Sequence, residues 1–553
     1  MKISLCAINS KYIHSTLAVW YLAASLEKHS PKTEYAVVEG TINEKEELIY
    51  GRLLETKADI IAFSTYIWNK KIVLSLAEKL KNELGCKILL GGPEVSYNVK
   101  EIFDKYPFVD YIISGEGEEP ISKLCNEEAT EKIEGLCYKK GVDVVVKPPC
   151  LSKNDPPNPY TGKYLEALKG RISYIETSRG CPFKCAFCLS GRQEGVRFFD
   201  LEQSKEKILL LANSGTQTVK FIDRTFNADR KRARDIFRFI IDEREKRIPL
   251  GVCFHFEIEG ELLDDETVEL LKTAPAGLFQ FEIGLQSFNK STLNSINRKA
   301  NLNRLCDRIK SVIDLGNIHT HIDLIIGLPK ENLESFRKSF NRAYALKPHM
   351  LQLGFLKLLH GADLRKDKSY DGAFIDTPPY EIKLTPWISE DEIQRLHSLE
   401  DVFEKMYNSS RFTLTCDYLD SLYSDAFEMY SRFSDYVTAT EHQNTLDSFT
   451  KLIFDFFGGE EGVSKALLRD KLALDRLASN RMGALPDFLK VKCPKMKKYL
   501  AELERDVNTK KQKNIKRAAT LLLSENKLAY VDYDRAGYLT NRFLLKFTEI
   551  FDN

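Results

Sequence analysis

The sequence predicts a multidomain α/β protein that ends in a mainly helical domain. Short apolar, β-branched runs alternate with amphipathic stretches in two separate parts of the chain, which is typical of parallel sheets covered by helices. Strand-like runs then fade, and the length of 553 residues leaves room for several hydrophobic cores. We therefore expect α/β domains at residues 1–147 and 171–389, a linker at 148–170 and a helical domain at 390–553.

The first α/β domain is predicted to be a Rossmann-like open sheet with strands at 2–8, 35–38, 60–64, 87–90 and 111–113, followed by a hairpin at 133–147. Sheets of this type bind ligands in the crevice beyond the carboxyl ends of their strands. The loops there combine glycines, which allow close backbone approach, with aromatic and polar side chains. The candidate ligand-binding residues of these loops are Tyr66, Trp68, Gly91, Gly92, Pro93, Glu94, Ser96, Gly115, Glu116, Gly117 and Glu118.

The second α/β domain is predicted to be an incomplete (β/α)6 barrel rather than the closed eight-unit form. Amphipathic stretches such as 229–245 and 331–346 separate its strand-like runs. Polar residues at the carboxyl ends of the strands are expected to point into the barrel mouth. The runs lie at 172–177, 219–222, 252–256, 279–284, 322–326 and 351–355.

The C-terminal part carries no catalytic motif. Residues 370–387 are expected to form an ordered linker or, alternatively, a lid across the barrel mouth. Eleven Lys and Arg residues between 490 and 517 indicate a solvated helical face, with a polyanion-binding patch as the alternative. Apolar residues at three- and four-residue steps predict a buried helix face, with a substrate-facing wall as the alternative. These residues are Leu419, Tyr423, Phe427, Tyr430 and Phe433.

Composition excludes several classes of protein. The 81 Lys and Arg residues balance 80 Asp and Glu residues, so the formal charge of +1 predicts no general attraction to nucleic acid or to anionic membranes. Neither a secretory signal nor an apolar run of about eighteen residues is found, and we expect a soluble, cytoplasmic protein without a membrane span. Twelve cysteines are too few for a disulfide scaffold, so a tight cysteine cluster first suggests a metal site or a catalytic site.

Such a cluster follows the first predicted barrel strand, where Cys181, Cys185 and Cys188 lie within eight residues. Thiolates prefer iron–sulfur clusters, zinc or copper(I). A structural zinc site needs four ligands, and the nearest downstream histidine, His255, is 67 residues after Cys188. Three cysteines on a cubane cluster would leave one iron free to bind a small chelating molecule. The spacing therefore predicts an iron–sulfur cluster, with zinc as the alternative.

The C-x3-C-x2-C spacing, with Phe187 before the last cysteine, resembles the signature of the radical S-adenosylmethionine (SAM) superfamily. This resemblance implies a 4Fe–4S cluster whose free iron binds SAM, and an electron donor such as flavodoxin or ferredoxin. Reductive cleavage of SAM then gives a 5′-deoxyadenosyl radical. By the same resemblance, contacts to ribose and methionine are expected from Glu257, Gln286 and Ser287, and contacts to adenine from Phe187, Gly327 and Leu328.

The glycine loops, directly upstream of such a barrel, resemble the cobalamin-binding domain of cobalamin-dependent radical SAM enzymes. The resemblance covers about residues 1–360, and the C-terminal domain resembles a helical extension of uncharacterised family members. Members that place a histidine beneath cobalt carry D-x-H-x-x-G, whereas around His14 this chain has Tyr12 and Leu17 in place of Asp and Gly. The resemblance therefore implies cobalamin without a histidine lower ligand.

The family chemistry implies a methyltransferase that acts on an unactivated carbon. One SAM would methylate reduced cobalamin, and another would supply the radical that removes a substrate hydrogen. A cobalamin-dependent cyclase or other rearrangement enzyme is an alternative, because it would use the same loops. A tRNA methylthiotransferase would need three N-terminal cysteines for a second cluster, whereas Cys6 and Cys86 are predicted to be separate buried thiols. A non-catalytic cobalamin sensor would have little use for the cysteine cluster.

Overall fold

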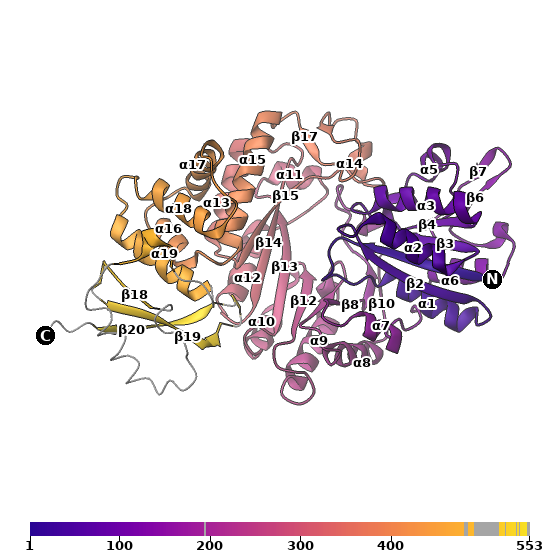
Figure 1. The fold of residues 1–553 in the computed structure, drawn as a ribbon, viewed down its shortest axis with the longest axis horizontal. Helices are drawn as coiled ribbons and strands as arrows, with labels where there is room; N and C mark the ends of the chain where they lie inside the picture. The colour runs from indigo at the N-terminus through magenta and orange to yellow at the C-terminus, as the bar shows by residue number, and fades with distance from the viewer. Residues whose placement is uncertain are drawn as a thin grey trace. The chain divides into compact units, whose positions relative to one another are not determined.

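The computed structural model describes residues 1–192, 195–479, 485–491, 519–525, 527–537, 539–540 and 542–549 (Figure 1). It contains two compact units. The first comprises Met1–Glu282, Leu293–Asn301 and Phe355–Thr385, and the second comprises Ile283–Thr292, Leu302–Gly354 and Pro386–Asn553. The predicted N-terminal domain and the first barrel strands therefore belong to the same compact unit.

The N-terminal sheet has the order β2-β1-β3-β4-β5-β6-β7, with β1 to β5 parallel and the β6–β7 hairpin antiparallel. The order of the parallel strands reverses between β1 and β3, which places the ligand crevice at their carboxyl ends. The strands are β1 (Lys2–Asn9), β2 (Glu34–Thr41), β3 (Ile60–Ser64), β4 (Lys87–Gly91), β5 (Tyr111–Ile113), β6 (Leu136–Lys140) and β7 (Asp143–Val145), and the helices are α1 (Ala18–His29), α2 (Glu46–Thr56), α3 (Lys70–Leu84), α4 (Pro93–Ser96), α5 (Val99–Lys105) and α6 (Glu118–Cys125).

The barrel strands form a second, six-stranded sheet with β8 and β15 at its edges, which confirms the incomplete barrel. It is preceded by α7 (Gly162–Ala167), and β9 (Ser178–Gly180) pairs separately with β10 (Val196–Phe198). The sheet has the order β8 (Ser173–Ile175), β11 (Thr218–Phe221), β12 (Cys253–Ile258), β13 (Phe279–Gln286), β14 (His319–Ile326) and β15 (Met350–Phe355), and its helices are α8 (Leu201–Ala212), α9 (Arg230–Glu243), α10 (Asp265–Lys272), α11 (Lys290–Ser295), α12 (Leu302–Ile313) and α13 (Leu333–Ala345).

Alternation along the barrel strands separates an apolar face from a polar face. Phe254 and Phe256 on β12 are fully buried, as are Phe279 and Phe281 on β13. The residues between them are only partly buried. Because successive side chains of a strand point to opposite faces, this period of two gives the sheet one packed aromatic face and one polar face.

The C-terminal part is mainly helical, as predicted, but it ends in an antiparallel sheet that the sequence analysis missed. Leu419, Phe427, Tyr430 and Phe433 are buried as predicted, but they do not form one helix face: Leu419 lies on the helix Thr413–Asp420, the last three lie on the helix Ala426–Ala439, and Tyr423 is partly buried in the turn between them. Apart from its first two residues, the basic stretch 490–517 lies outside the described residues. The elements are α14 (Asp363–Lys366), β16 (Ala373–Phe374), β17 (Ile382–Leu384), α15 (Glu390–Phe403), α16 (Thr413–Asp420), α17 (Ala426–Ala439), α18 (Leu446–Phe457), α19 (Lys465–Ser479), β18 (Ala519–Leu521), β19 (Lys527–Ala536) and β20 (Phe543–Glu549).

Within the described ranges, none of the helices combines the length and the apolar character that crossing a bilayer requires.

Candidate functional site

The three motif cysteines lie on the loop that follows β9. Gly180 ends this strand with φ of 96°, and a Cβ atom there would lie 2.3 Å from the carbonyl oxygen of Gly195. All three cysteines are free thiols; Cys185 is buried, whereas Cys181 and Cys188 are partly exposed. The loop therefore combines two partly exposed cysteines with one buried cysteine.

Each cysteine sulfur has a polar neighbour. The Thr225 hydroxyl lies 3.3 Å from Cys181 Sγ, and the backbone N–H of Ser190 donates to Cys188 Sγ at 3.4 Å. Arg298 Nη1 donates to Cys185 Sγ at 3.9 Å. Burial raises the pKa of the Cys185 thiol, and the Arg298 guanidinium opposes this shift. Such donors favour thiolates, the form in which cysteine binds metal.

Arg298 is a buried cation beside the motif cysteine Cys185, and the sequence analysis did not identify it. Its Nη2 atom forms an ion pair with Glu259 Oε2 at 2.7 Å, and both side chains are nearly buried. Burial alone would lower the pKa of Arg298, but Glu259 and Cys185 raise it. No local motif marks a residue that is 113 positions from its sulfur partner.

In the described part of the chain, no group of three or more Cys, His, Asp or Glu side chains converges closely enough to hold a single metal ion. Thiolates that each bind a different iron of one cluster need not converge on one point. The polar neighbours of all three sulfurs fit a cluster with three thiolate ligands.

A buried ion network connects the start of the cysteine loop to the loop of Glu116 and Glu118. Arg179 Nη1 donates to Glu116, Nη2 donates to Glu118 Oε1 at 2.6 Å, and Nε donates to Glu176 at 3.0 Å. Arg197 adds a second cation at 2.8 Å from Glu116. Burial opposes the charge of Arg179, but Glu176 and Glu118 raise its pKa well above the ordinary value.

A cavity of about 980 Å³ lies at the carboxyl ends of the N-terminal strands. This is near the upper end of the roughly 300–1,000 Å³ usual for small-molecule and cofactor sites. The rings of Tyr66 and Trp68 stack in its wall with centroids 4.5 Å apart. The barrel strands and the following segment also contribute to the wall, through Tyr174, Glu176, Arg179, Arg192, Ile222, Arg224, Gly361 and Lys366.

Ten of the eleven predicted loop residues line this cavity, namely Tyr66, Trp68, Gly91, Gly92, Pro93, Ser96, Gly115, Glu116, Gly117 and Glu118. Glu94 differs from the expectation. Its carboxylate is buried, accepts a hydrogen bond from Tyr380 Oη at 2.8 Å and lies 3.4 Å from Lys70 Nζ. Glu94 therefore uses its charge within the protein, because a buried carboxylate needs such partners.

Two of these cavity-lining glycines also pack closely against the backbone of the protein itself. Gly92 has φ of 104°, and a Cβ atom there would lie 2.6 Å from the carbonyl oxygen of Thr65. Gly115 has φ of 86°, and its Cβ atom would lie 2.3 Å from the carbonyl oxygen of Cys150. The backbone of the protein itself requires both glycines, whereas at Gly91 the nearest atom is 3.9 Å away.

His14 also lines the cavity, and its Nδ1 atom lies 2.7 Å from the Tyr174 hydroxyl. Burial lowers the pKa of His14, and the neighbouring Lys11, Lys220 and Arg171 add to this shift. The ring is therefore neutral near pH 7.

The residues expected to contact SAM lie in both compact units. In the first unit, Phe187 is partly buried on the cysteine loop, and Glu257 lies on β12 with Arg224 Nη1 3.7 Å from its carboxylate. Burial raises the pKa of Glu257, and Arg224 opposes this shift. In the second unit, Gln286 ends β13 with φ of 72°, and Gly327, with φ of 88°, and Leu328 directly follow β14.

Ser287, in the second unit, is fully buried, and its hydroxyl donates to Glu331 Oε1 at 2.6 Å. The side chain therefore connects two loops of the protein.

Sequence reasoning also missed a polar cluster on the accessible face of the first barrel strands. Glu282 Oε2 accepts from Lys220 Nζ at 3.2 Å and lies 2.9 Å from His255 Nε2. The alternation of polar residues with buried phenylalanines on β12 and β13 is the signal that could have identified it.

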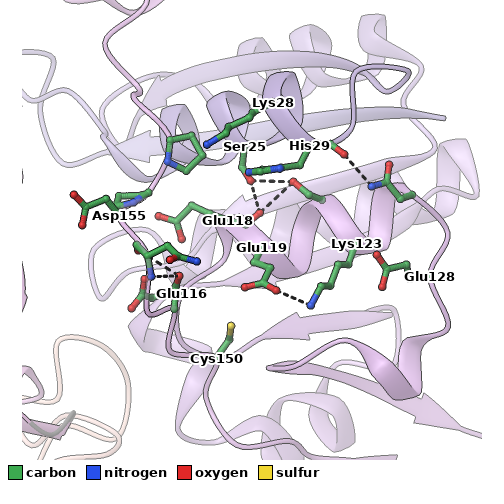
Figure 2. A pocket seen from close by; sticks show the side chains of 16 residues that line it. Ser25, Lys28, His29, Glu116, Glu118, Glu119, Lys123, Glu128, Cys150 and Asp155 are labelled. Atoms are coloured by element: carbon green, nitrogen blue, oxygen red, sulfur yellow. Dashed lines mark hydrogen bonds and ion pairs between the residues drawn. The ribbon is translucent and has the colours of Figure 1, made fainter. Parts of the chain in front are cut away.

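A smaller cavity of about 530 Å³ shares Glu116 and Glu118 with the large one (Figure 2). Figure 2 shows Glu119 paired with Lys123 along α6, and the Ser25 hydroxyl donating to the Glu118 carbonyl oxygen. The Glu119 and Lys123 side chains form an ion pair with an N···O distance of 2.6 Å. This wall is thus braced by contacts within the protein.

Three family models match the chain in sequence. The model for the B12 binding domain covers residues 3–124, and the model for the radical SAM superfamily covers residues 175–343. The third model, described as a protein of unknown function (DUF4080), covers residues 368–534. The first two matches coincide with the parts that carry the cavity loops and the cysteine loop.

Two similar proteins are methyltransferases. The 2-(S-pantetheinyl)-carbapenam-3-carboxylate methyltransferase of Streptantibioticus cattleyicolor is 28% identical over 51% of this chain and 44% of its own length. The cobalamin-dependent radical SAM methyltransferase TokK of Streptomyces tokunonensis is 26% identical over 61% of this chain and 52% of its own length. This chain therefore spans about half the length of these relatives.

Among solved structures, the cobalamin-dependent SAM radical enzyme OxsB with aqua-cobalamin and SAM bound is similar over 92% of this chain and 80% of its own. The TM-score is 0.60 at 15% sequence identity, which shows a shared fold. The order of matched domains, the six-stranded sheet and the cysteine motif agree with this fold. Residues 175–343 thus match the radical SAM superfamily, and a stretch that matches the B12 binding domain precedes them, within a fold similar to that of OxsB.

Proposed function

We propose that this protein is a methyltransferase that uses cobalamin, SAM and a 4Fe–4S cluster to methylate an unactivated carbon. The observation that carries the proposal is the large cavity, whose wall combines the loops of the B12-binding domain with strand ends and the cysteine loop of the radical SAM domain. The likeness to two methyltransferases supports methyl transfer. When bound, the cluster supplies the electron for SAM cleavage, and cobalamin carries the methyl group.

The residues of the chain hold and shield these groups. Cys181, Cys185 and Cys188 would bind three irons, and the donors at their sulfurs offset thiolate charge, which favours electron uptake by the cluster. The Arg179 network holds the cysteine loop and the Glu116–Glu118 loop together. The stacked rings of Tyr66 and Trp68 would shield part of the cavity from water.

We propose that cobalamin binds without a histidine lower ligand. The departure from D-x-H-x-x-G around His14 supports this proposal. We further propose a cytoplasmic enzyme that receives electrons from a flavodoxin or ferredoxin, since a reduced cluster needs a reducing compartment.

The first test compares two cysteine variants after anaerobic reconstitution with iron, sulfide and a chemical reductant. Cys185→Ala should abolish 5′-deoxyadenosine formation from SAM, whereas Cys306→Ala should retain it, because Cys306 is outside the motif and only partly buried. Undiminished 5′-deoxyadenosine formation by Cys185→Ala would contradict the cluster. A site fully occupied by zinc that accepts no iron would do the same.

The second test separates methyl transfer from rearrangement. The reconstituted protein, with cobalamin and SAM labelled in its methyl group, is incubated with extracts of the producing cell. Methyl transfer predicts a labelled product one carbon heavier than its substrate. Rearrangement instead predicts an isomer without label. Two observations disfavour the tRNA methylthiotransferase alternative: Cys6 and Cys86 are buried thiols, and burial raises the pKa of Cys6 to about 12.

A further inference from the structure

The segment from Phe355 to Thr385, here called the strap, follows the last barrel strand and belongs to the first compact unit. It contacts the cysteine loop at two points. The backbone N–H of Leu364 donates to the carbonyl oxygen of Ala186 at 2.9 Å, and Asp363 forms an ion pair with Arg192. Gly361 and Lys366 of the strap line the large cavity. The strap is therefore part of the cavity wall and is anchored beside the motif cysteines.

The strap also contacts the loops of the B12-binding domain. Gly361, with φ of 86°, packs against the ring of Tyr97, and a Cβ atom there would lie 2.3 Å from that ring. Further along, the Tyr380 hydroxyl lies between two buried charges. It accepts a hydrogen bond from Lys70 Nζ at 2.9 Å and donates one to Glu94 Oε2 at 2.8 Å. The strap thus touches both cofactor-binding regions of the first unit.

Lys70 and Glu94, the two partners of the Tyr380 hydroxyl, lie next to residues that line the cavity. Lys70 begins α3, directly after the turn that carries Tyr66 and Trp68. Glu94 lies in α4, between the cavity-lining Pro93 and Ser96. A buried ion pair is costly unless further hydrogen bonds satisfy it, and the Tyr380 hydroxyl satisfies both partners here. One tyrosine on the strap therefore restrains two cavity loops.

Packing around Tyr380 fixes its ring. The side chain is 1% exposed, the His360 ring meets it edge-on at 5.1 Å between centroids, and the Arg365 guanidinium lies 5.1 Å from the ring centroid. Its backbone has φ of 57°, a conformation that residues other than glycine seldom adopt. A side chain held in this way can transmit movement of the strap to the loops.

We propose that the strap closes the cobalamin cavity and that Tyr380 is a positioning residue that sets how fast cobalamin leaves. This inference rests on the proposed function, because it takes cobalamin as the occupant of the cavity. Removing the hydroxyl leaves Lys70 and Glu94 each with one partner fewer, so the two loops should separate from the strap more often. The motif cysteines keep their own donors, and the cluster should be unaffected.

The test measures cobalamin release from the full-length protein. Wild-type protein and Tyr380→Phe are loaded with cobalamin and desalted, and the absorbance of bound cobalamin is followed with time; iron content is measured in the same samples. Tyr380→Phe should release cobalamin roughly tenfold faster at equal iron content, as expected when a hydrogen bond to a charged group is lost. Glu94→Gln should change the release in the same direction.

Tyr344→Phe is the matched control, because the Tyr344 hydroxyl donates to a carboxylate, that of Asp420, in the second unit. Equal release rates for wild type and Tyr380→Phe would overturn the inference while leaving the proposed function intact. Equally fast release by Tyr344→Phe would also overturn it, since the effect would then be general loosening. Wild-type protein that binds no cobalamin would overturn the proposed function itself, and with it the role of the strap.

Discussion

At the scale of single residues, Glu331 is a fully buried carboxyl group, and in the described part of the chain its Oε2 atom has no hydrogen-bond partner. It accepts hydrogen bonds from the hydroxyls of Ser287 and Ser339 at 2.6 and 2.9 Å. Burial raises its pKa to about 7, and the two hydroxyls only partly offset this shift. The native state therefore keeps the Glu331 proton up to a higher pH than the unfolded chain does.

The sign of the pH dependence follows from this raised pKa. The stability that protonated Glu331 contributes is present below about pH 4.5 and is lost as the pH rises through about 7. Glu331→Gln should therefore unfold at higher denaturant concentration than wild type at pH 8, by a free energy on the order of 2 kcal/mol. The difference should shrink at pH 5. Glu334→Gln, at an exposed position of α13, is the control, and identical pH profiles for wild type and Glu331→Gln would refute the assignment.

At the scale of elements, the conformation of the loop after β4 depends on Gly92 more than on the neighbouring Gly91. Gly92→Ala should lower the free energy of unfolding by about 2 kcal/mol or more, because alanine would need a strained backbone and would meet the Thr65 carbonyl oxygen. Gly91→Ala should cost far less, since no atom lies within 3.9 Å of the added carbon. Thermal unfolding of the two variants measures the difference, and similar melting temperatures would contradict it.

Elements with a local pattern were predictable from the sequence, and contacts between distant segments were not. The alternation of Phe254 and Phe256 with polar residues marks β12, and the cysteine spacing marks the candidate cluster-binding loop. By contrast, Arg298 approaches Cys185, and Tyr380 approaches Glu94 across 286 positions. No periodicity encodes such pairs, because only the completed fold brings them together. The sequence analysis missed the strands β19 and β20, because it assigned the whole region after residue 390 to a helical domain.

At the scale of the whole molecule, the first compact unit joins the B12-binding domain to the start of the barrel through buried polar contacts. Arg171 Nη1 forms an ion pair with Glu39 at 2.7 Å, and the Ser15 hydroxyl donates to the carbonyl oxygen of Ile172 at 2.8 Å. The Arg179 network and Tyr380 add two more connections. We expect these contacts, rather than the segment 148–170 that was predicted to be a linker, to hold the cavity walls together.

Cutting the linker should therefore leave the protein assembled. A protease site inserted after the exposed Lys153 allows the chain to be cleaved once, and the two fragments should elute together in size-exclusion chromatography with unchanged cobalamin content. The physical reason is that separating them would expose several paired charges and the apolar cavity wall at the same time. The same cleavage in an Arg171→Gln background should allow partial separation, because Glu39 would lose its buried partner. Complete separation of the cleaved wild-type fragments would show that the linker, and not the contacts, holds the unit together.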